Sequence, residues 1–146
     1  MPVTRRCTVP ADAALFFPVI TFSADNGGVP MPASDEQLRA SVVNSLDGAT
    51  ASASLDGCEI PGIAGFRSGL AEFAYDCPTG DCVYQTFGSD FSGHVEPAYA
   101  IGHSLLFAPL PSGTHTVHFE GTYDGGTPDD AADDFTLDTT YELTVE

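Results

Sequence analysis

Four histidines are the only imidazoles of the chain, and two of them, His115 and His118, lie three residues apart; the others are His94 and His103. A pair so close in sequence suggests metal chelation. Side chains alternate along a β-strand, however, so residues three apart face opposite sides and cannot bind one ion unless the strand bulges. We expect His115 to point inward beside Val117 and Phe119 as a hydrogen-bonded core histidine.

No nucleophile motif accompanies these histidines. A Gly-x-Ser-x-Gly elbow is absent, because Ser68 lies one position late in the segment 65–69. No glycine loop of the kind that cradles phosphate occurs. With 21 acidic residues, some pair of carboxylates will always have the separation that a glycosidase needs. The presence of such a pair therefore does not distinguish a glycosidase from a protein without activity. The sequence therefore favours a protein without an active centre.

Four cysteines, Cys7, Cys58, Cys77 and Cys82, allow three full pairings. Cys77 and Cys82 flank a four-residue turn, and facing residues of a hairpin lie about 4.5 to 5.5 Å apart at Cα, which suits a disulfide. If these two pair, Cys7 and Cys58 are left to join the N-terminal strand to the segment after residue 57. A zinc site would need a second pair of ligands that this spacing lacks. Disulfides imply an oxidising compartment, so we expect an extracellular or cell-surface protein.

The chain is strongly acidic, with 4 Lys+Arg against 21 Asp+Glu and a formal charge of −17. Such a balance, without any lysine, fits a halophilic-type surface whose carboxylates are screened by salt. The alternative is Ca²⁺ binding by oxygen ligands. The densest acidic group, which lacks EF-hand spacing and is expected to be a solvated loop, comprises Asp124, Asp129, Asp130, Asp133 and Asp134.

Charge and hydropathy also exclude several partners. Nucleic-acid binding needs clustered basic residues, and an anionic membrane surface would repel this chain. No apolar run reaches the roughly 18 residues of a transmembrane helix. No export signal precedes Cys7 in this sequence. We therefore expect neither a nucleic-acid partner nor membrane insertion.

Aromatic residues gather between two turns and could offer a platform for carbohydrate. The alternative, which we favour, is that alternate aromatics fill the core of the domain. The residues concerned are Tyr75, Tyr84, Phe87, Phe91 and Tyr99.

The elements that would position these residues are mainly β-strands. Residues 135–145 alternate between apolar and polar over eleven positions, which predicts one face on a core and one face in water. Such strands are typical of an antiparallel sheet packed on a second layer. We predict a two-layer antiparallel, jelly-roll-like β-sandwich, a single domain over 1–146, with strands at 6–9, 14–22, 50–56, 70–75, 82–87, 94–100, 103–108, 114–121 and 135–145.

One segment carries helical signals instead. Ser34 and Gln37 have the spacing of a capping box, and acidic residues occupy the first turn. Leu38, Val42 and Leu46 then recur every four residues. We predict one helix over 35–46 that packs on the sandwich by this stripe.

Six motifs occur in order along nearly the whole chain. They are Arg-Cys-Thr-Val-Pro-Ala at 6–11, Ala-Leu-Phe-Phe-Pro-Val-Ile at 14–20, Leu-Asp-Gly at 55–57, Phe-Arg-Ser at 66–68, Pro-Leu-Pro-Ser-Gly-Thr-His-Thr-Val-His-Phe at 109–119 and Thr-Tyr-Glu-Leu-Thr-Val at 140–145. In this order they resemble a family of uncharacterised secreted bacterial and archaeal proteins. The resemblance implies a secreted β-sandwich and brings no activity or site residue with it.

We therefore predict a non-catalytic extracellular structural or interaction module, a subunit of a surface or filamentous assembly that joins through strand edges. One alternative is an extracellular hydrolase of polysaccharide with a cleft lined by Tyr75, Tyr84 or Tyr99. Another is a carbohydrate-binding module stabilised by Ca²⁺. A deep pocket with converging histidines and acids would favour catalysis, and an unpaired edge strand would favour assembly.

Overall fold

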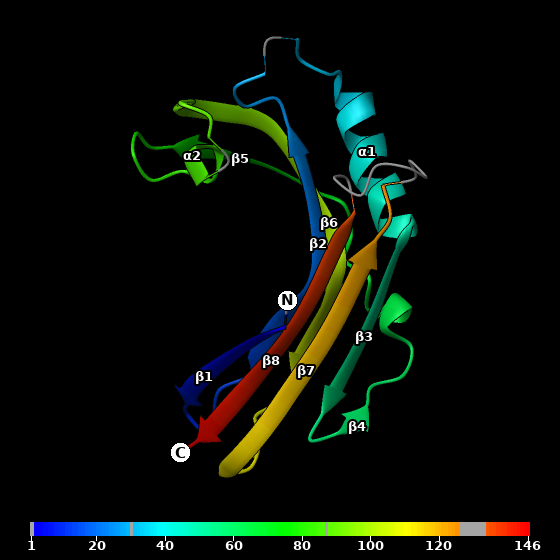
Figure 1. Cartoon of the computed structure of the whole chain (residues 1–146), viewed down its shortest axis with the longest axis vertical. Coiled ribbons are helices and arrows are strands. Elements are labelled where there is room, and N and C mark those ends of the chain that lie inside the picture. Colours follow the sequence, from blue (N-terminus) through cyan, green and yellow to red (C-terminus); the bar gives the residue numbers. More distant parts are fainter. Residues whose placement is uncertain (1, 30, 87, 126–133) are drawn as a thin grey trace. The chain divides into compact units, whose positions relative to one another are not determined.

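The computed structural model describes residues 2–29, 31–86, 88–125 and 134–146 (Figure 1). Chain contacts divide it into two compact units, one of residues 1–21, 45–68 and 102–146 and the other of residues 22–44 and 69–101. Two strands and one helix contribute residues to both units. Among the described residues, no helix combines the length and the apolar character needed to cross a bilayer.

The chain is mainly β, with two sheets packed together, which confirms the predicted sandwich. The strands are β1 (Val3–Val9), β2 (Leu15–Asp25), β3 (Ala49–Leu55), β4 (Cys58–Glu59), β5 (Ala71–Cys77), β6 (Gly93–Phe107), β7 (Gly113–Tyr123) and β8 (Phe135–Val145). The helices are α1 (Asp35–Asp47), α2 (Val83–Thr86) and the 3-10 turn η1 (Ile63–Phe66).

The first unit contains a five-stranded sheet in the order β1-β8-β7-β3-β4. β7 and β8 form a long antiparallel ladder, and β3 lies antiparallel to β7 on its other side. β1 instead runs parallel to β8, which differs from the all-antiparallel sheet that we expected. Only strands joined by a short turn must be antiparallel, and no such turn joins β1 to β8.

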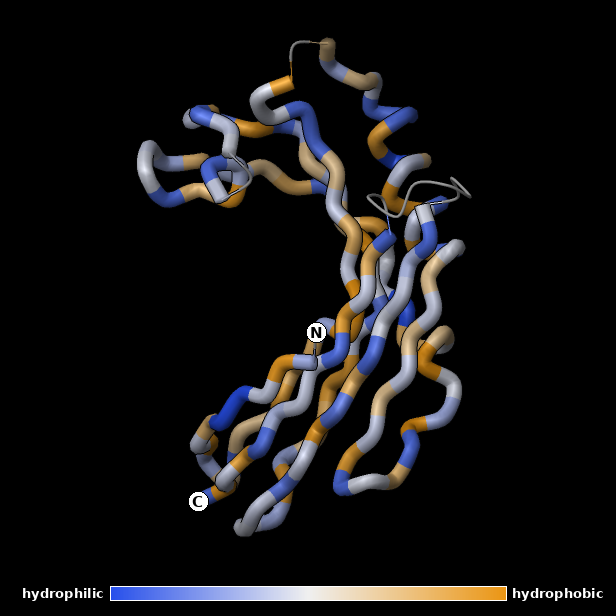
Figure 2. Tube along the Cα trace, in the orientation of Figure 1, coloured by the Kyte–Doolittle hydropathy of each residue, from blue (hydrophilic) through white to orange (hydrophobic). Residues whose placement is uncertain are grey.

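The core of this unit lies between the five-stranded sheet and the adjoining parts of β2 and β6. Phe17 of β2 is its centre, with ring centroids 5.2 Å from Tyr141, 5.8 Å from Phe107 and 6.2 Å from Phe119. The buried members are Phe17, Val19, Ala53, Ile63, Leu105, Val117, Phe119 and Leu143. Figure 2 shows hydrophilic and hydrophobic residues alternating along β7 and β8, the pattern from which these inward positions were predicted.

The outward face of the same sheet consists of hydroxyl-bearing and charged residues. In each register row, the strands place polar residues side by side, for example Thr50, Thr122 and Thr136. Strand alternation places Glu120, Asp138 and His118 on this face as well. The sheet therefore has one apolar side and one polar side.

The second unit contains β5, the end of β2 from residue 22 onward, the start of β6 up to residue 101, and most of α1. The three strands have the order β2-β6-β5, with β5 antiparallel to β6. The predicted capping box is present at α1, because Ser34 N donates to Gln37 Oε1 at 2.8 Å and Gln37 N donates to Ser34 Oγ at 3.3 Å. Leu38 and Val42 of the helical stripe are buried here, as is Leu46 in the first unit.

Two strand predictions were wrong. In the segment predicted as a strand at 82–87, the described residues 82–86 do not form one. The short helix α2 begins there, because Gln85 N donates to the carbonyl oxygen of Cys82 and Cys82 N donates to Gln85 Oε1, both at 3.0 Å. Residues 94–100 and 103–108 belong to one continuous strand, β6. Gly102 marks a close approach rather than a turn, since a Cβ there would lie 2.5 Å from the carbonyl oxygen of Ile20.

Candidate functional site

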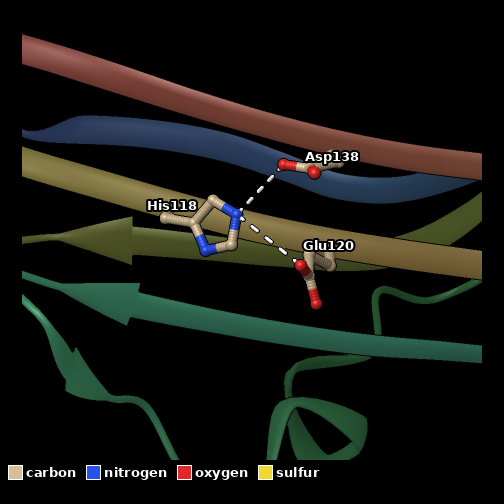
Figure 3. A group of neighbouring side chains, drawn as sticks. All are labelled: His118, Glu120 and Asp138. Atoms are coloured by element: carbon tan, nitrogen blue, oxygen red, sulfur yellow. Dashed lines mark hydrogen bonds and ion pairs between the residues drawn. The ribbon is translucent and has the colours of Figure 1, made fainter. Parts of the chain in front are cut away.

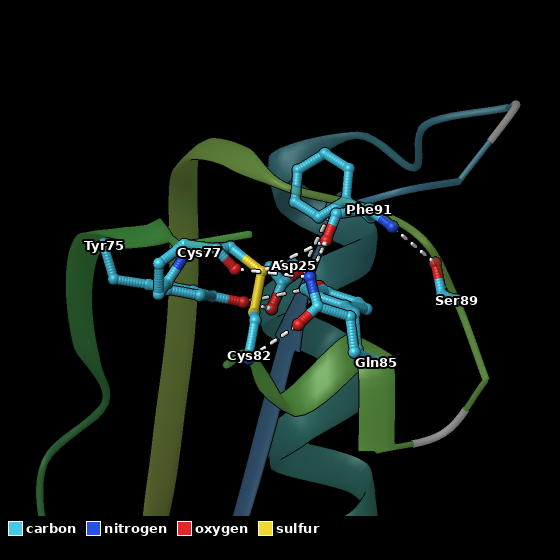
Figure 4. The surroundings of a disulfide bond; sticks show 10 residues. Asp25, Tyr75, Cys77, Cys82, Gln85, Ser89 and Phe91 are labelled. Carbon is cyan, nitrogen blue, oxygen red and sulfur yellow. Dashed lines mark hydrogen bonds between the residues drawn. A yellow bond between two sulfur atoms is a disulfide. The ribbon is translucent and has the colours of Figure 1, made fainter. Parts of the chain in front are cut away.

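Two of the three tyrosines considered as a ligand-binding alternative meet at one carboxylate in the second unit, and Figure 4 shows one of them, Tyr75, beside that carboxylate, Asp25. Asp25 accepts hydrogen bonds from Tyr75 Oη at 3.1 Å, from Tyr84 Oη, and from the backbone N of Gly27 at 2.8 Å. Burial and the hydrogen bond to Asp25 raise the pKa of Tyr84. Both phenols therefore remain protonated donors at neutral pH, and the cluster is a structural anchor.

The third tyrosine lies elsewhere. Tyr99 has 0% of its surface exposed, and the guanidinium of Arg39 lies 4.3 Å from its ring centroid. It offers no surface to a sugar. Phe91 packs edge-on against Tyr84 at 5.2 Å, and Phe87 lies outside the described residues.

The disulfide between Cys77 and Cys82 is confirmed, with a Cα separation of 5.3 Å. The side-chain amide of Gln85 holds the loop around it, donating to the carbonyl oxygens of Pro78 at 3.2 Å and Phe91 at 3.1 Å (Figure 4).

The predicted pairing of Cys7 with Cys58 was wrong, because both thiols are free and exposed. Cys7 lies on β1 and Cys58 on β4, at opposite edges of the five-stranded sheet. Four inter-strand steps separate them, about 19 Å. A disulfide needs Cα atoms less than about 7 Å apart.

The acidic group predicted as an alternative Ca²⁺ site falls largely outside the described residues. Asp129, Asp130 and Asp133 lie in that part of the chain, while Asp124 and Asp134 are both exposed. The solvated loop therefore stays a prediction, with calcium binding as its alternative.

His115 behaves as predicted. Its side chain is 14% exposed, Nδ1 lies 2.8 Å from Asp56 Oδ2, and Nε2 lies 2.9 Å from the carbonyl oxygen of Pro111. These hydrogen bonds raise its pKa. His103 differs, because burial and the nearby Arg67 charge lower the pKa of its ring.

His118 belongs to a cluster that the sequence analysis did not identify (Figure 3). Its Nε2 lies 3.1 Å from Asp138 Oδ1 and 3.8 Å from Glu120 Oε1. His118 and Glu120 are two residues apart on β7, so they share a face, and the register places Asp138 of β8 directly opposite Glu120. The alternation of β7 and β8 in the sequence shows which face each of these side chains takes. The sequence does not show the register that brings Asp138 of β8 next to His118 and Glu120 of β7.

A hollow of about 480 Å³ spans β1, β8 and β7 and is lined by residues that include Arg6, Thr8, Thr116 and Glu142. The histidine it contains, His115, already has a partner for each ring nitrogen. Every hydrogen bond that the described histidines make goes to a carboxylate or a carbonyl oxygen, and none of them goes to a serine or a thiol.

No protein-family model matches the sequence, and no curated protein matches it. Among solved structures, the solution structure of amebosin aligns at 12% identity over 99% of this chain and 96% of that chain, with a TM-score of 0.25. A likeness this weak carries no argument about fold or function.

Proposed function

We propose that the protein is a non-catalytic extracellular module that assembles with copies of itself through the edges of its five-stranded sheet. The observation that carries the proposal is the strand order β1-β8-β7-β3-β4, which leaves β1 and β4 each with one neighbour among the described residues. Unpaired strand edges present backbone donors and acceptors that another chain can satisfy.

The two edges have complementary charge. β1 carries Arg5 and Arg6, two of the 4 basic residues in a chain of charge −17, and of these two Arg6 also pairs with Glu142 of the neighbouring strand β8. β4 carries Glu59, and Asp56 precedes it in the connecting turn. Opposite charges steer the β1 edge of one copy toward the β4 edge of the next.

Each edge also carries a free thiol on the same side of the sheet. Cys7 is in register with Leu143, a buried core residue, and Cys58 is opposite Leu55, which packs against that core. In a sheet that continues from one copy into the next, Cys7 and Cys58 would therefore share a face. A contact between two different edges is heterologous, so it extends into a row instead of closing as a dimer.

A disulfide between Cys7 and Cys58 of two copies would lock such a row. The two thiols lose two protons and two electrons, and a low-molecular-weight disulfide accepts both to give two thiols. The Cys77–Cys82 disulfide supports the oxidising compartment that this step requires.

Light scattering and electron microscopy of the protein with oxidised glutathione, compared with the reduced protein, test the proposal. We expect a ladder of covalent oligomers and extended particles, and dimers at most from Cys7→Ser or Cys58→Ser. A monomer under both conditions, with no extended particle, would reject assembly.

A further inference from the structure

We infer that His118, Glu120 and Asp138 form a surface site for a divalent ion of the zinc class. The inference is independent of the proposed assembly. The three ligand atoms, one imidazole nitrogen and two carboxylate oxygens, all lie within 4.8 Å of one another. Figure 3 shows both acids directed at the same ring nitrogen, Nε2 of His118.

The distances suit one ion. Zinc binds nitrogen and oxygen ligands at about 2.0 to 2.2 Å in tetrahedral geometry, which places the ligand atoms of a site about 3.4 Å apart. The Nε2 atom lies 3.1 Å from Asp138 Oδ1 and 3.8 Å from Glu120 Oε1. The two carboxylate oxygens lie within 4.8 Å of each other, so rotation of the Glu120 and Asp138 side chains would bring all three ligands onto one ion.

The other carboxylate-bonded histidines lack this convergence. His94 contacts Asp76 through Nδ1 at 2.7 Å and Glu96 through Nε2 at 3.3 Å, so its acids lie at opposite nitrogens. His115 likewise divides its two acceptors between the two nitrogens. A metal ion binds a histidine ring through one nitrogen, in place of the proton there. Of these three rings, only His118 has both of its acids at the same nitrogen, so only His118 can bind an ion together with both of them.

The surroundings favour a cation and leave room for it. Glu120 and Asp138 each form an ion pair with His118, whereas Arg6, Arg39 and Arg67 are engaged with other acids. A hollow of about 180 Å³ lies beside Glu120 and is lined by Thr50, Ser52 and Thr122 among others. A solvent molecule can occupy the fourth position of a zinc ion there.

The donor set selects the ion class. Ca²⁺ and Mg²⁺ take oxygen ligands, so an imidazole nitrogen between two carboxylates favours zinc and its neighbours Co²⁺ and Ni²⁺. The field of a chain with charge −17 raises the local concentration of any cation.

The test is calorimetric titration of Zn²⁺ into chelator-treated protein at about pH 7.5, in a Cys7→Ser/Cys58→Ser background that removes the competing thiols. We expect one ion per chain, no saturable binding to His118→Ala, and affinity at least about tenfold weaker in Glu120→Gln and in Asp138→Asn, the loss that even outer-shell changes cause. His94→Ala is the matched control and should bind as the parent does.

A second readout separates a metal ligand from a residue that only holds the sheet together. Zn²⁺ should shift the ring ¹⁵N resonance of His118 Nε2 and leave that of His94 unchanged. Absence of saturable binding up to millimolar Zn²⁺, an affinity of His118→Ala equal to that of the parent, or an equal loss in His94→Ala would overturn the inference.

Discussion

His115 and Asp56 form an ion pair in which Nδ1 of the ring lies 2.8 Å from the carboxylate oxygen Oδ2. The second carboxylate oxygen accepts a hydrogen bond from the backbone N of Thr116 at 2.8 Å, and the ring Nε2 faces the carbonyl oxygen of Pro111. Both ring nitrogens thus face acceptors, so the imidazolium form satisfies them best. The pair ties the turn after β3 to the start of β7.

This pair should make stability depend on pH. The hydrogen bond that the ring donates to Asp56, and then the one that it donates to the carbonyl oxygen of Pro111, raise the pKa of His115 above its usual 6.5. The hydrogen bonds that the Asp56 carboxylate accepts, first from His115 and then from the backbone N of Thr116, lower the pKa of Asp56 below 3.8. The contribution of His115 to the free energy of unfolding is complete below about pH 6.5, and it disappears as the pH rises through the raised pKa of the folded protein. The aspartate contribution is complete above about pH 3.8 and disappears as the pH falls through the lowered pKa.

Asp56→Asn isolates this effect, because asparagine tolerates the positive φ of 51° at that position. We expect the free energy of unfolding of the wild type to exceed that of the variant most between about pH 4 and 6.5, and the difference to shrink toward pH 9. Urea unfolding of both proteins across this range measures it. A difference that stays constant from pH 6 to 9 would contradict a charged pair.

Leu46 of α1 tests the core. Its side chain is 1% exposed, so Leu46→Ala should lower the free energy of unfolding by about 2 to 5 kcal/mol. Leu106→Ala is the matched control, because Leu106 is 72% exposed and its truncation should stay within about 0.5 kcal/mol. Equal losses in the two variants would show that the helical stripe is not part of the core.

The disulfide and the free thiols should differ in their contribution to stability. Cys77→Ser/Cys82→Ser releases a short loop, and the chain-entropy estimate for such a loop is about 2 kcal/mol. Cys7→Ser/Cys58→Ser removes two exposed free thiols and should leave the stability of the reduced monomer within about 0.5 kcal/mol. Thermal unfolding under non-reducing conditions compares the first variant with the wild type. If stability instead fell when Cys7 and Cys58 were replaced and stayed unchanged when Cys77 and Cys82 were replaced, the assignment of the disulfide to Cys77–Cys82 would be contradicted.

Gly27 tests the tyrosine anchor. A Cβ at this position would lie 2.6 Å from Cζ of Tyr84, so Gly27→Ala must displace the ring and break its hydrogen bond with Asp25. We expect a loss of about 1 to 3 kcal/mol, the usual range for overpacking. Gly65→Ala is the control, since a Cβ there would meet nothing within 4 Å. A Gly27→Ala variant as stable as the control would show that Tyr84 is not held in place.

Patterns within one segment predicted the fold well. The alternation of 135–145 identified β8, and Ser34 with Gln37 identified the start of α1. These signals are local, because a strand period and a capping box each depend on neighbouring residues. The same reasoning failed at 82–87, where side-chain and backbone bonds between Cys82 and Gln85 produce a helical turn.

Relations between distant segments could not be predicted. Cys7 and Cys58 were paired by elimination, but strand order separates them to opposite edges. The cluster of His118, Glu120 and Asp138 depends on the β7–β8 register, in which Glu120 faces Asp138. A shift of one residue would turn Asp138 to the other face, so composition and spacing alone do not determine such a site.

Assembly through the sheet edges is tested most directly by mass spectrometry of an oxidised, equimolar mixture of unlabelled and ¹⁵N-labelled protein, digested without reduction. The proposed row predicts a peptide in which Cys7 is joined to Cys58, with about half of these peptides carrying one labelled and one unlabelled partner. Finding Cys7 and Cys58 joined only within one chain, or both free while Cys77–Cys82 is intact, would contradict it.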